Sequence, residues 1–326
     1  ASESRHMANR KTSGQGAFQF SYREDLRTLP EAALEHEVKL HGGFAVDKRP
    51  GQGEVYYGMP GAGIMRVSAD LTSQEIIEVS PELVDVNFHS TKIGEFDGAP
   101  RLFLPANADE MVAVLTLEGD TEFILPTPEF EQYADTEQAP YRPTDTIPDG
   151  DSLVVTDGYG ANYITTAHLP SKEWTAIFGG RSSDPTQLGK YGTAHGINRT
   201  PDGDHIAIAD RPHSRIEVVT FDGGGSTSYG LPEGSRPCGI DFVDWDNHWY
   251  AAIGSLDDPQ EGTPAPIYIL DGETYEVLST IRPKEDLGIE LADHMHNVTW
   301  NVYDGRLYLM CQAWNPGLYF VLELDA

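Results

Sequence analysis

A repeated unit runs through most of this chain and limits what the chain can fold into. Each copy begins with a histidine or a small polar residue, continues as a short apolar run, turns at Gly, Asp or Asn, and returns as a second apolar run. Six copies occur, spaced 43 to 58 residues apart, and they begin at His41, His89, Asp145, His195, Cys238 and His296. Self-similarity at such an interval is the mark of a repeat architecture.

Each copy continues with one or two further alternating runs. In the fourth copy these are RIEVVTFDG at 215–223 and TSYGLP at 227–232, joined by a Gly-rich turn of the hairpin kind. Repeats of 40–50 residues with about four strands each are typical of propeller blades. We therefore expect an all-β fold, a six-bladed β-propeller with four-stranded blades, as a single domain over residues 17–326.

The two ends of the chain are expected to meet in the last blade. The sixth copy reaches residue 326 with only about three strands, and FQFSYREDL at 18–26 is a strand candidate that would complete it. Such closure removes an open sheet edge. LPEAALEHEVKL at 29–40 is the helix-compatible stretch, read as a link into the first blade. Residues 1–16, which start with ASESRHM, are interpreted as a leftover expression tag or a disordered N-terminus.

The excess of acidic residues argues against nucleic acid and anionic membranes as partners. It carries 22 Lys and Arg against 52 Asp and Glu, a formal net charge of −30. Nucleic acid and anionic membranes repel such a surface, and no apolar run approaches the ~20 residues of a membrane span. Two cysteines are too few for a disulfide framework. We expect a soluble protein, secreted or periplasmic after loss of a leader or otherwise cytoplasmic, with its oligomeric state open.

The repeat also predicts a metal site. The first strand of each blade lines the central channel, so the six starting residues should form a ring at one mouth. Blades two, four and six each contribute a histidine, which brings His89, His195 and His296 together on the axis. Three imidazoles with an open position form the ligand set of a catalytic divalent metal. Zinc is the first expectation, with iron, copper and manganese as alternatives, and a structural calcium is also considered.

The other ring positions are weaker candidates for contact with the metal or a substrate. His294 lies two residues before His296, on the same strand face, and is an alternative ligand or a neighbour of the ligand. Asp145 and Cys238 face the channel by position. His41 fits the template less well, because the turn that follows it is longer.

Two further side chains follow the second strands of blades three and four, at the ends of TDGY (156–159) and ADRP (209–212). Tyr159 can act as a base beside a divalent cation, which favours the phenolate. Arg211 suits a substrate carboxylate or a developing oxyanion. Without the histidines, the favoured interpretation would be that Tyr159 packs between blades and Arg211 pairs with Asp210 or a neighbouring blade.

Residues 141–219 resemble a known family. This stretch contains PTD, DGY followed by Asn and an aliphatic residue, an FG-rich linker, HGI, and ADR followed by Arg-Ile. It is similar to the NHL-type propeller of peptidyl-α-hydroxyglycine α-amidating lyase. The resemblance implies a zinc held by three histidines of alternate blades, which are His89, His195 and His296 in this chain, with the catalytic tyrosine at Tyr159 and the catalytic arginine at Arg211.

One departure from the family pattern concerns the substrate. The family carries another catalytic arginine at the end of a first-blade strand, where this chain has Tyr57, Gly58 and Met59. Arg66 is the nearest candidate and lies several residues later. The departure leaves the metal chemistry in place and puts the hydroxyglycine substrate in doubt.

Three functions follow from these observations. The leading hypothesis is a metal-dependent lyase that cleaves a C–N or C–O bond next to a hydroxyl-bearing carbon in a small-molecule or short peptide-like substrate. The second is a metal-dependent hydrolase or eliminating enzyme on another small acidic or hydroxylated molecule, favoured by the missing arginine and the insertion at 255–266. The third is a non-catalytic binding platform, since a propeller fold alone does not fix function.

Overall fold

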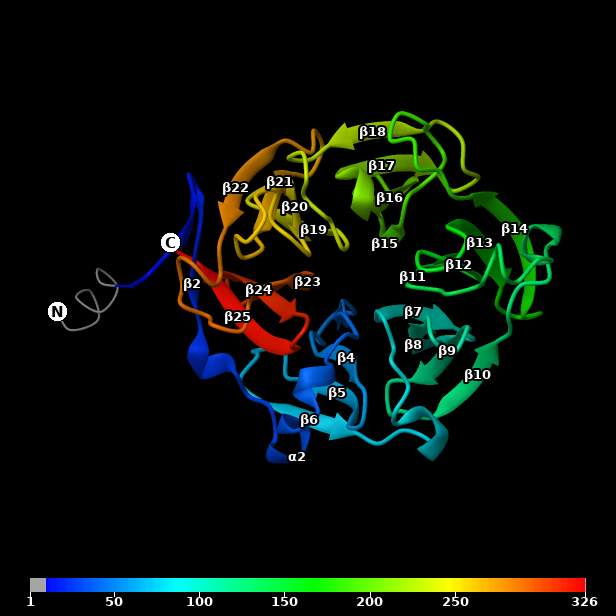
Figure 1. The fold of residues 1–326 in the computed structure, drawn as a ribbon. Coiled ribbons are helices and arrows are strands. Elements are labelled where there is room, and N and C mark those ends of the chain that lie inside the picture. Colours follow the sequence, from blue (N-terminus) through cyan, green and yellow to red (C-terminus); the bar gives the residue numbers. More distant parts are fainter. Residues whose placement is uncertain (1–9, 326) are drawn as a thin grey trace.

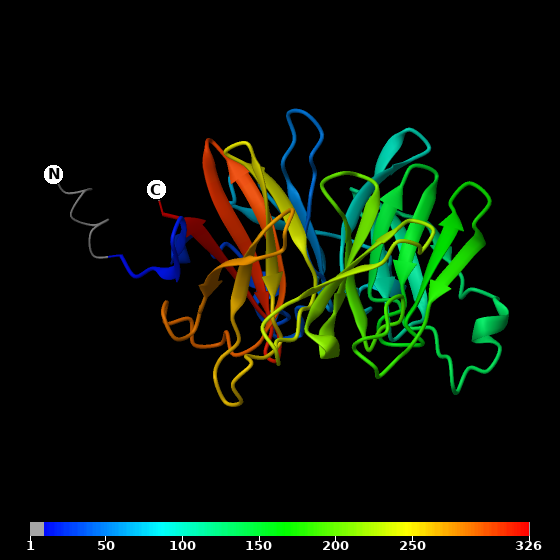
Figure 2. The ribbon, with the colours of Figure 1, turned by 90° about the horizontal axis from the view of Figure 1, so that it is seen from above.

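Six antiparallel sheets stand around a central axis in the computed structural model, which describes residues 10–325 (Figure 1). The chain passes once around the ring, blade after blade, and the spatial order of strands in blades one to five follows the sequence. Seen from the side, the blades form a short cylinder with loops at both ends (Figure 2). The prediction of a six-bladed β-propeller is confirmed.

The first three blades have four strands each, and their strands follow one another from the axis outward. Blade one consists of β3 (Ala45–Val46), β4 (Val55–Met59), β5 (Gly63–Val67) and β6 (Gln74–Ile77). Blade two consists of β7 (Lys92–Phe96), β8 (Ala99–Ala106), β9 (Met111–Thr116) and β10 (Thr121–Leu125). Blade three consists of β11 (Asp145–Asp149), β12 (Ser152–Thr156), β13 (Tyr163–His168) and β14 (Glu173–Gly179).

The last three blades repeat this order until the ring closes. Blade four consists of β15 (Ala194–Arg199), β16 (His205–Asp210), β17 (Arg215–Thr220) and β18 (Thr227–Gly230). Blade five consists of β19 (Asp241–Trp245), β20 (His248–Gly254), β21 (Ile267–Asp271) and β22 (Val277–Ile281). Blade six consists of β23 (Met295–Tyr303), β24 (Arg306–Ala313), β25 (Leu318–Leu324), β2 (Phe18–Tyr22) and β1 (Ser13–Gln15).

The sixth blade joins the two ends of the chain. Strand β2 pairs with β25, with Phe20 opposite Leu324, and the two strands lie side by side in Figure 1. The prediction that residues 18–26 complete the last blade is therefore confirmed for 18–22, and the ring has no open edge at this point. Strand β1 adds a fifth strand inside the stretch predicted to lie outside the domain, whereas residues 1–9 fall outside the described part of the chain.

Apolar side chains between neighbouring blades form the core. Middle strands are buried on both faces and therefore read as near-continuous apolar runs, such as HIAIAD in β16. Between blades three and four, Val154 packs with Ile197 and Ile208, all at most 1% exposed. Each blade is thus fixed by its neighbours, and the innermost strands are held at defined distances from the axis.

The helices in residues 10–325 are all short, and all but one (η5, inside blade four) lie in links between blades. None of them is long and apolar enough to cross a bilayer. These helices are η1 (Glu24–Leu26), α2 (Glu31–Leu34), η2 (Glu37–Lys39), η3 (Pro81–Leu83), η4 (Glu131–Tyr133) and η5 (Arg211–His213). The helix-compatible stretch 29–40 forms one turn of α-helix and one 3₁₀ turn. Leu34 and Val38 remain exposed there, so the stretch lacks the continuous apolar face that stabilises a longer helix.

Candidate metal centre

Four imidazoles meet on the propeller axis at the entry to the innermost strands. His89 precedes β7, His195 lies on β15 and His296 lies on β23, so the three histidines predicted from alternate blades are brought together. His41, which precedes β3, joins them. The Nε2 atoms of His89 and His195 are 3.0 Å apart, and those of His41 and His296 are 2.9 Å apart.

Mutual distance selects a slightly different trio from the one that the repeat predicts. His41, His89 and His296 offer ligand atoms that all lie within 4.8 Å of one another, and this group could hold a metal ion. His195 reaches the group through His89. His41 is one of the weaker candidates in the sequence because a longer turn follows it. Its place at the start of the first repeat was the signal that could have found it.

Backbone carbonyls fix the orientation of two of the rings. Nδ1 of His89 lies 2.9 Å from the carbonyl oxygen of Thr144, and Nδ1 of His195 bonds the carbonyl oxygen of Cys238. A carbonyl oxygen only accepts, so each Nδ1 carries the hydrogen and each Nε2 presents a lone pair. The two facing Nε2 atoms then have no hydrogen between them. Imidazoles held through their outer nitrogen in this way suit a divalent metal.

The close approach of blades four and five depends on a glycine. Gly196 follows His195, and a Cβ there would lie 2.4 Å from the carbonyl oxygen of Cys238. The same carbonyl accepts the His195 hydrogen bond, so a larger residue would push apart the contact that orients the ring. The glycine of the HGI motif is therefore required by the close contact between blades four and five.

Burial keeps these histidines neutral. His89, His195 and His296 are each 1% exposed. Burial lowers the pKa of His89 to about 3, and it holds the pKa values of His41, His195 and His296 well below their ordinary value. Neutral imidazole is the form that binds a metal.

Tyr159 and Arg211 complete the cluster. The Oη of Tyr159 lies 3.1 Å from Nε2 of His195, and Arg211 donates to that Oη over 3.1 Å and to the same Nε2 over 2.9 Å. Burial raises the pKa of Tyr159, and the neighbouring Arg211 guanidinium opposes this rise. The two residues predicted from the ends of the second strands thus lie against the histidines.

A tight turn after β12 aims Tyr159 at the axis. The Asp157 carboxylate accepts hydrogen bonds from the backbone N–H groups of Arg142 (2.6 Å) and Ala161 (2.8 Å) and from the hydroxyl of Tyr133 (2.9 Å). These bonds fix both sides of the turn. Burial raises the pKa of Asp157 to about 7, while the hydrogen bonds act in the opposite direction.

Arg211 is a buried cation whose hydrogen-bond partners are neutral. It is 7% exposed, and besides Tyr159 and His195 its guanidinium contacts Sγ of Cys238 at 3.2 Å. No ion pair to Arg211 occurs within residues 10–325, and its Nε has no hydrogen-bond partner there. Asp210 instead bonds Nδ1 of His213 at 2.8 Å and Nε of Arg215 at 3.1 Å. The guanidinium is therefore left available for an anionic ligand.

Asp145, the one acidic residue among the six repeat starts, links neighbouring blades. Its carboxylate accepts hydrogen bonds from Lys92 Nζ (2.7 Å), from the Ser90 hydroxyl (2.7 Å) and from the backbone N–H of Ile197 (3.0 Å). These donors come from blades two and four, so the carboxylate links three blades. Sequence reasoning missed Lys92, because a single lysine on a strand carries no pattern.

Two other candidates lie apart from the four imidazoles. Nδ1 of His294 bonds the carbonyl oxygen of Leu256 at 2.9 Å and lies 3.0 Å from the Asp257 carboxylate. Arg66, on β5, donates to Glu75 on β6 at 2.7 Å. Both side chains are thus engaged by neighbours outside the cluster.

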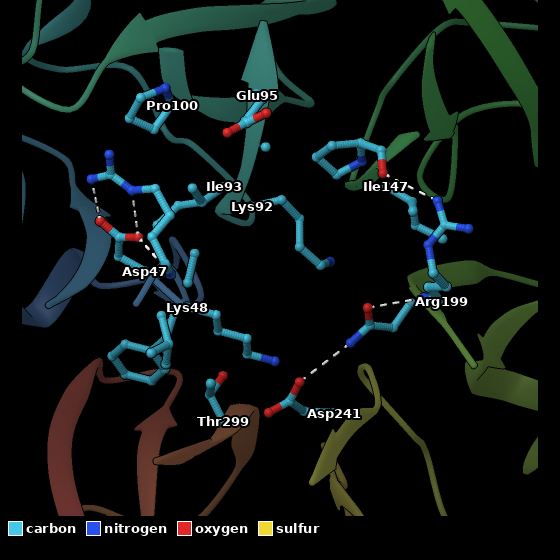
Figure 3. Close-up of a pocket in the computed structure, with 17 residues that line it drawn as sticks. Asp47, Lys48, Lys92, Ile93, Glu95, Pro100, Ile147, Arg199, Asp241 and Thr299 are labelled. Carbon is cyan, nitrogen blue, oxygen red and sulfur yellow. Dashed lines mark hydrogen bonds and ion pairs between the residues drawn. The ribbon is translucent and has the colours of Figure 1, made fainter. Parts of the chain in front are cut away.

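The opposite end of the innermost strands opens into a separate cavity of about 410 Å³, lined by residues of all six blades. Lys48 and Lys92 extend into it near Asp241 (Figure 3). Lys92 also forms an ion pair with Asp145 at the start of β11.

Comparisons with known proteins support the fold. No family model matches the sequence, and no curated protein matches it. A gluconolactonase structure from Xanthomonas campestris superposes with a TM-score of 0.61 at 13% identity, covering 97% of this chain and 95% of that one. A streptogramin B lyase structure superposes with a TM-score of 0.54 at 13% identity, covering 97% and 98%. These similarities support a β-propeller and do not extend to the amidating-lyase family.

Proposed function

We propose that this chain is a metal-dependent lyase that cleaves a C–N or C–O bond next to a hydroxyl-bearing carbon in a small, anionic substrate. The observation that carries the proposal is the buried Arg211 guanidinium, which contacts Tyr159 and His195 and has no ion-pair partner within residues 10–325. A buried charge is costly unless it is paired. A substrate carboxylate would supply the missing partner.

The donor set fits a divalent metal. His89, His195 and His296 would hold it, as the resemblance to the amidating lyases implies, and the Nδ1 hydrogens of His89 and His195 support this assignment. At Nε2 of His195 the metal would replace the hydrogen bond from Arg211. Zinc is the first choice for neutral imidazole ligands, with iron, copper and manganese as alternatives. When bound, the metal supplies Lewis acidity toward a substrate hydroxyl.

The side chains of the chain divide the remaining work. Arg211 binds the carboxylate and holds the substrate in place. Tyr159, as the phenolate that the neighbouring Arg211 favours, takes the hydroxyl proton on Oη. The O–H electron pair becomes the second bond of a carbonyl, the C–N pair leaves with the nitrogen, and the Tyr159 hydroxyl returns its proton to that nitrogen. On an acylated hydroxyglycine this sequence gives an amide and glyoxylate.

The test is glyoxylate release from an N-acyl hydroxyglycine by zinc-loaded protein. We expect turnover by the native chain, loss of at least about 100-fold in kcat/KM for Arg211→Met, and no change for Arg66→Met. Arg66 is a matched control because it bonds Glu75. Absence of glyoxylate with the native, metal-loaded chain would reject this substrate.

A second candidate is a hydrolase on a lactone or ester. One observation favours it: the first-blade position of the missing arginine is taken by Tyr57, whose hydroxyl donates to Gln74 at 2.6 Å. The gluconolactonase neighbour has the same kind of fold. Turnover of a lactone and ester panel that His195→Ala abolishes, without glyoxylate formation, would favour this function over the lyase.

A further inference from the structure

The two histidine trios on the axis share His89 and His296 and differ in their third member. The alternation of blades selects His195, whereas mutual distance selects His41. Nε2 of His195 lies 3.0 Å from Nε2 of His89, and Nε2 of His41 lies 2.9 Å from Nε2 of His296. We propose that all four imidazoles bind one divalent metal, which makes the centre a four-histidine site; this rests on the proposed function.

The four rings form one cluster rather than two pairs. The ligand atoms of His195 fall outside the group that lies mutually within 4.8 Å, so His195 has to move toward the other three for all four to bind one ion. The ring centroid of His41 is 4.5 Å from that of His89 and 4.2 Å from that of His296. The centroid of His195 is 4.5 Å from that of His89 and 4.9 Å from that of His296. His41 is thus as close to the two shared ligands as His195 is.

The outer nitrogen of His41 has its own anchor. Nδ1 lies 3.3 Å from Nδ2 of Asn87, while the buried Oδ1 of Asn87 has no hydrogen-bond partner in residues 10–325. Rotating the amide by 180° exchanges the two atoms, so that Oδ1 accepts the Nδ1 hydrogen of His41. Nε2 of His41 then presents its lone pair to the cluster, as in His89 and His195.

A competing arrangement exists for one pair. Nδ2 of Asn297 lies 2.6 Å from Nδ1 of His296, so His296 can carry its hydrogen on Nε2 and donate it to His41. That bond would satisfy the two rings without an ion. It has no counterpart between His89 and His195, whose hydrogens both lie on Nδ1. In that arrangement Nε2 of His296 offers no lone pair, so binding of an ion by all four rings requires the His296 hydrogen on Nδ1.

The ligand count has a consequence for the substrate. Four neutral imidazoles donate no negative charge, and the neighbouring Arg211 adds a further positive charge. Such a site keeps the full charge of the ion and favours an anionic substrate over a neutral one.

Cobalt(II) binding to the whole chain tests the assignment, with X-ray absorption at the cobalt edge to count imidazoles and chelator competition to measure Kd. We expect four imidazoles in the native protein and three in His41→Ala. We also expect Kd to rise more than about 100-fold, because losing a residue that merely orients a ligand typically costs 10–100-fold. His294→Ala is the matched control: it lies two residues from His296, bonds Leu256, and should leave both values unchanged.

The outcomes separate this inference from the proposed function. An unchanged imidazole count in His41→Ala, with Kd raised less than about 10-fold, would overturn the four-histidine site while the metal enzyme stands. A native chain that binds no cobalt would overturn both. His41→Gln, which keeps a polar side chain beside Asn87, gives a second reading if the alanine variant folds poorly, and it should also lose one imidazole.

Discussion

Arg211 donates a hydrogen bond of 3.1 Å to the hydroxyl of Tyr159, and this contact joins the second-strand ends of blades three and four at the propeller axis. The same guanidinium reaches Nε2 of His195 at 2.9 Å. One cation thus connects the candidate base to the imidazole cluster. This arrangement leads to predictions for each residue.

Replacing Tyr159 with phenylalanine removes the hydroxyl and keeps the ring between the blades. We expect kcat to fall by about 10²–10⁴, the usual contribution of a positioned acid or base, with little change in metal content. Steady-state kinetics and elemental analysis measure the two quantities. A Tyr159→Phe enzyme with native kcat would remove Tyr159 from the proton transfer.

Replacing Arg211 with methionine removes a buried charge that has no ion-pair partner within residues 10–325. We expect activity on an anionic substrate to be lost and the free energy of unfolding of the metal-free protein to rise by about 1–2 kcal/mol, since active sites often sacrifice stability for function. Urea unfolding measures the second effect. Destabilisation by Arg211→Met would show instead that the guanidinium supports the fold.

Removing the Asp145 carboxylate should weaken the contact among blades two, three and four. Asp145→Ala leaves Lys92 and the Ile197 N–H without their shared acceptor, so we expect a loss of about 3 kcal/mol in unfolding free energy. The control is Asp149→Ala, because Asp149 forms a more exposed ion pair with Arg199 and should cost less than about 1 kcal/mol. Equal losses of unfolding free energy in the two variants would mean that the Asp145 carboxylate stabilises the contact between blades no more than a surface ion pair does.

Asp157 should give the protein a pH-dependent stability. Its pKa is raised from 3.8 to about 7, so the folded chain binds the proton more tightly than the unfolded chain does. Its contribution to stability is therefore complete below about pH 4 and is lost as the pH rises through 7. Unfolding free energies from pH 4 to 8 should fall less steeply in Asp157→Asn than in the native protein. Parallel curves would contradict the raised pKa.

The sequence was enough to predict the ring and most of its central cluster. The repeat placed His89, His195 and His296 at matching strand starts, and the closed fold then brought them to one axis. The closing strand at Phe18–Tyr22 followed from an incomplete last repeat. The positions of these histidines and of the closing strand depend on the order of strands in the ring, and the repeat pattern predicts that order.

Other features depended on packing that no local pattern records. The longer turn after His41 hid its equivalence to the other starts, although its ring lies 4.2 Å from that of His296. Lys92 reaches Asp145 from another blade, and Asn87 lies beside His41 for the same reason. The stretch 29–40 has helix-forming residues but lacks a face to bury, so only short turns form.

Metal content measured by elemental analysis, on protein purified without chelator, tests the metal centre most directly. His89 belongs to both histidine trios, so His89→Ala should abolish binding, while His294→Ala should retain it. We predict about one divalent metal ion per native chain and none in His89→Ala. A native chain without stoichiometric metal, and with no affinity for added zinc, would contradict the proposed enzyme.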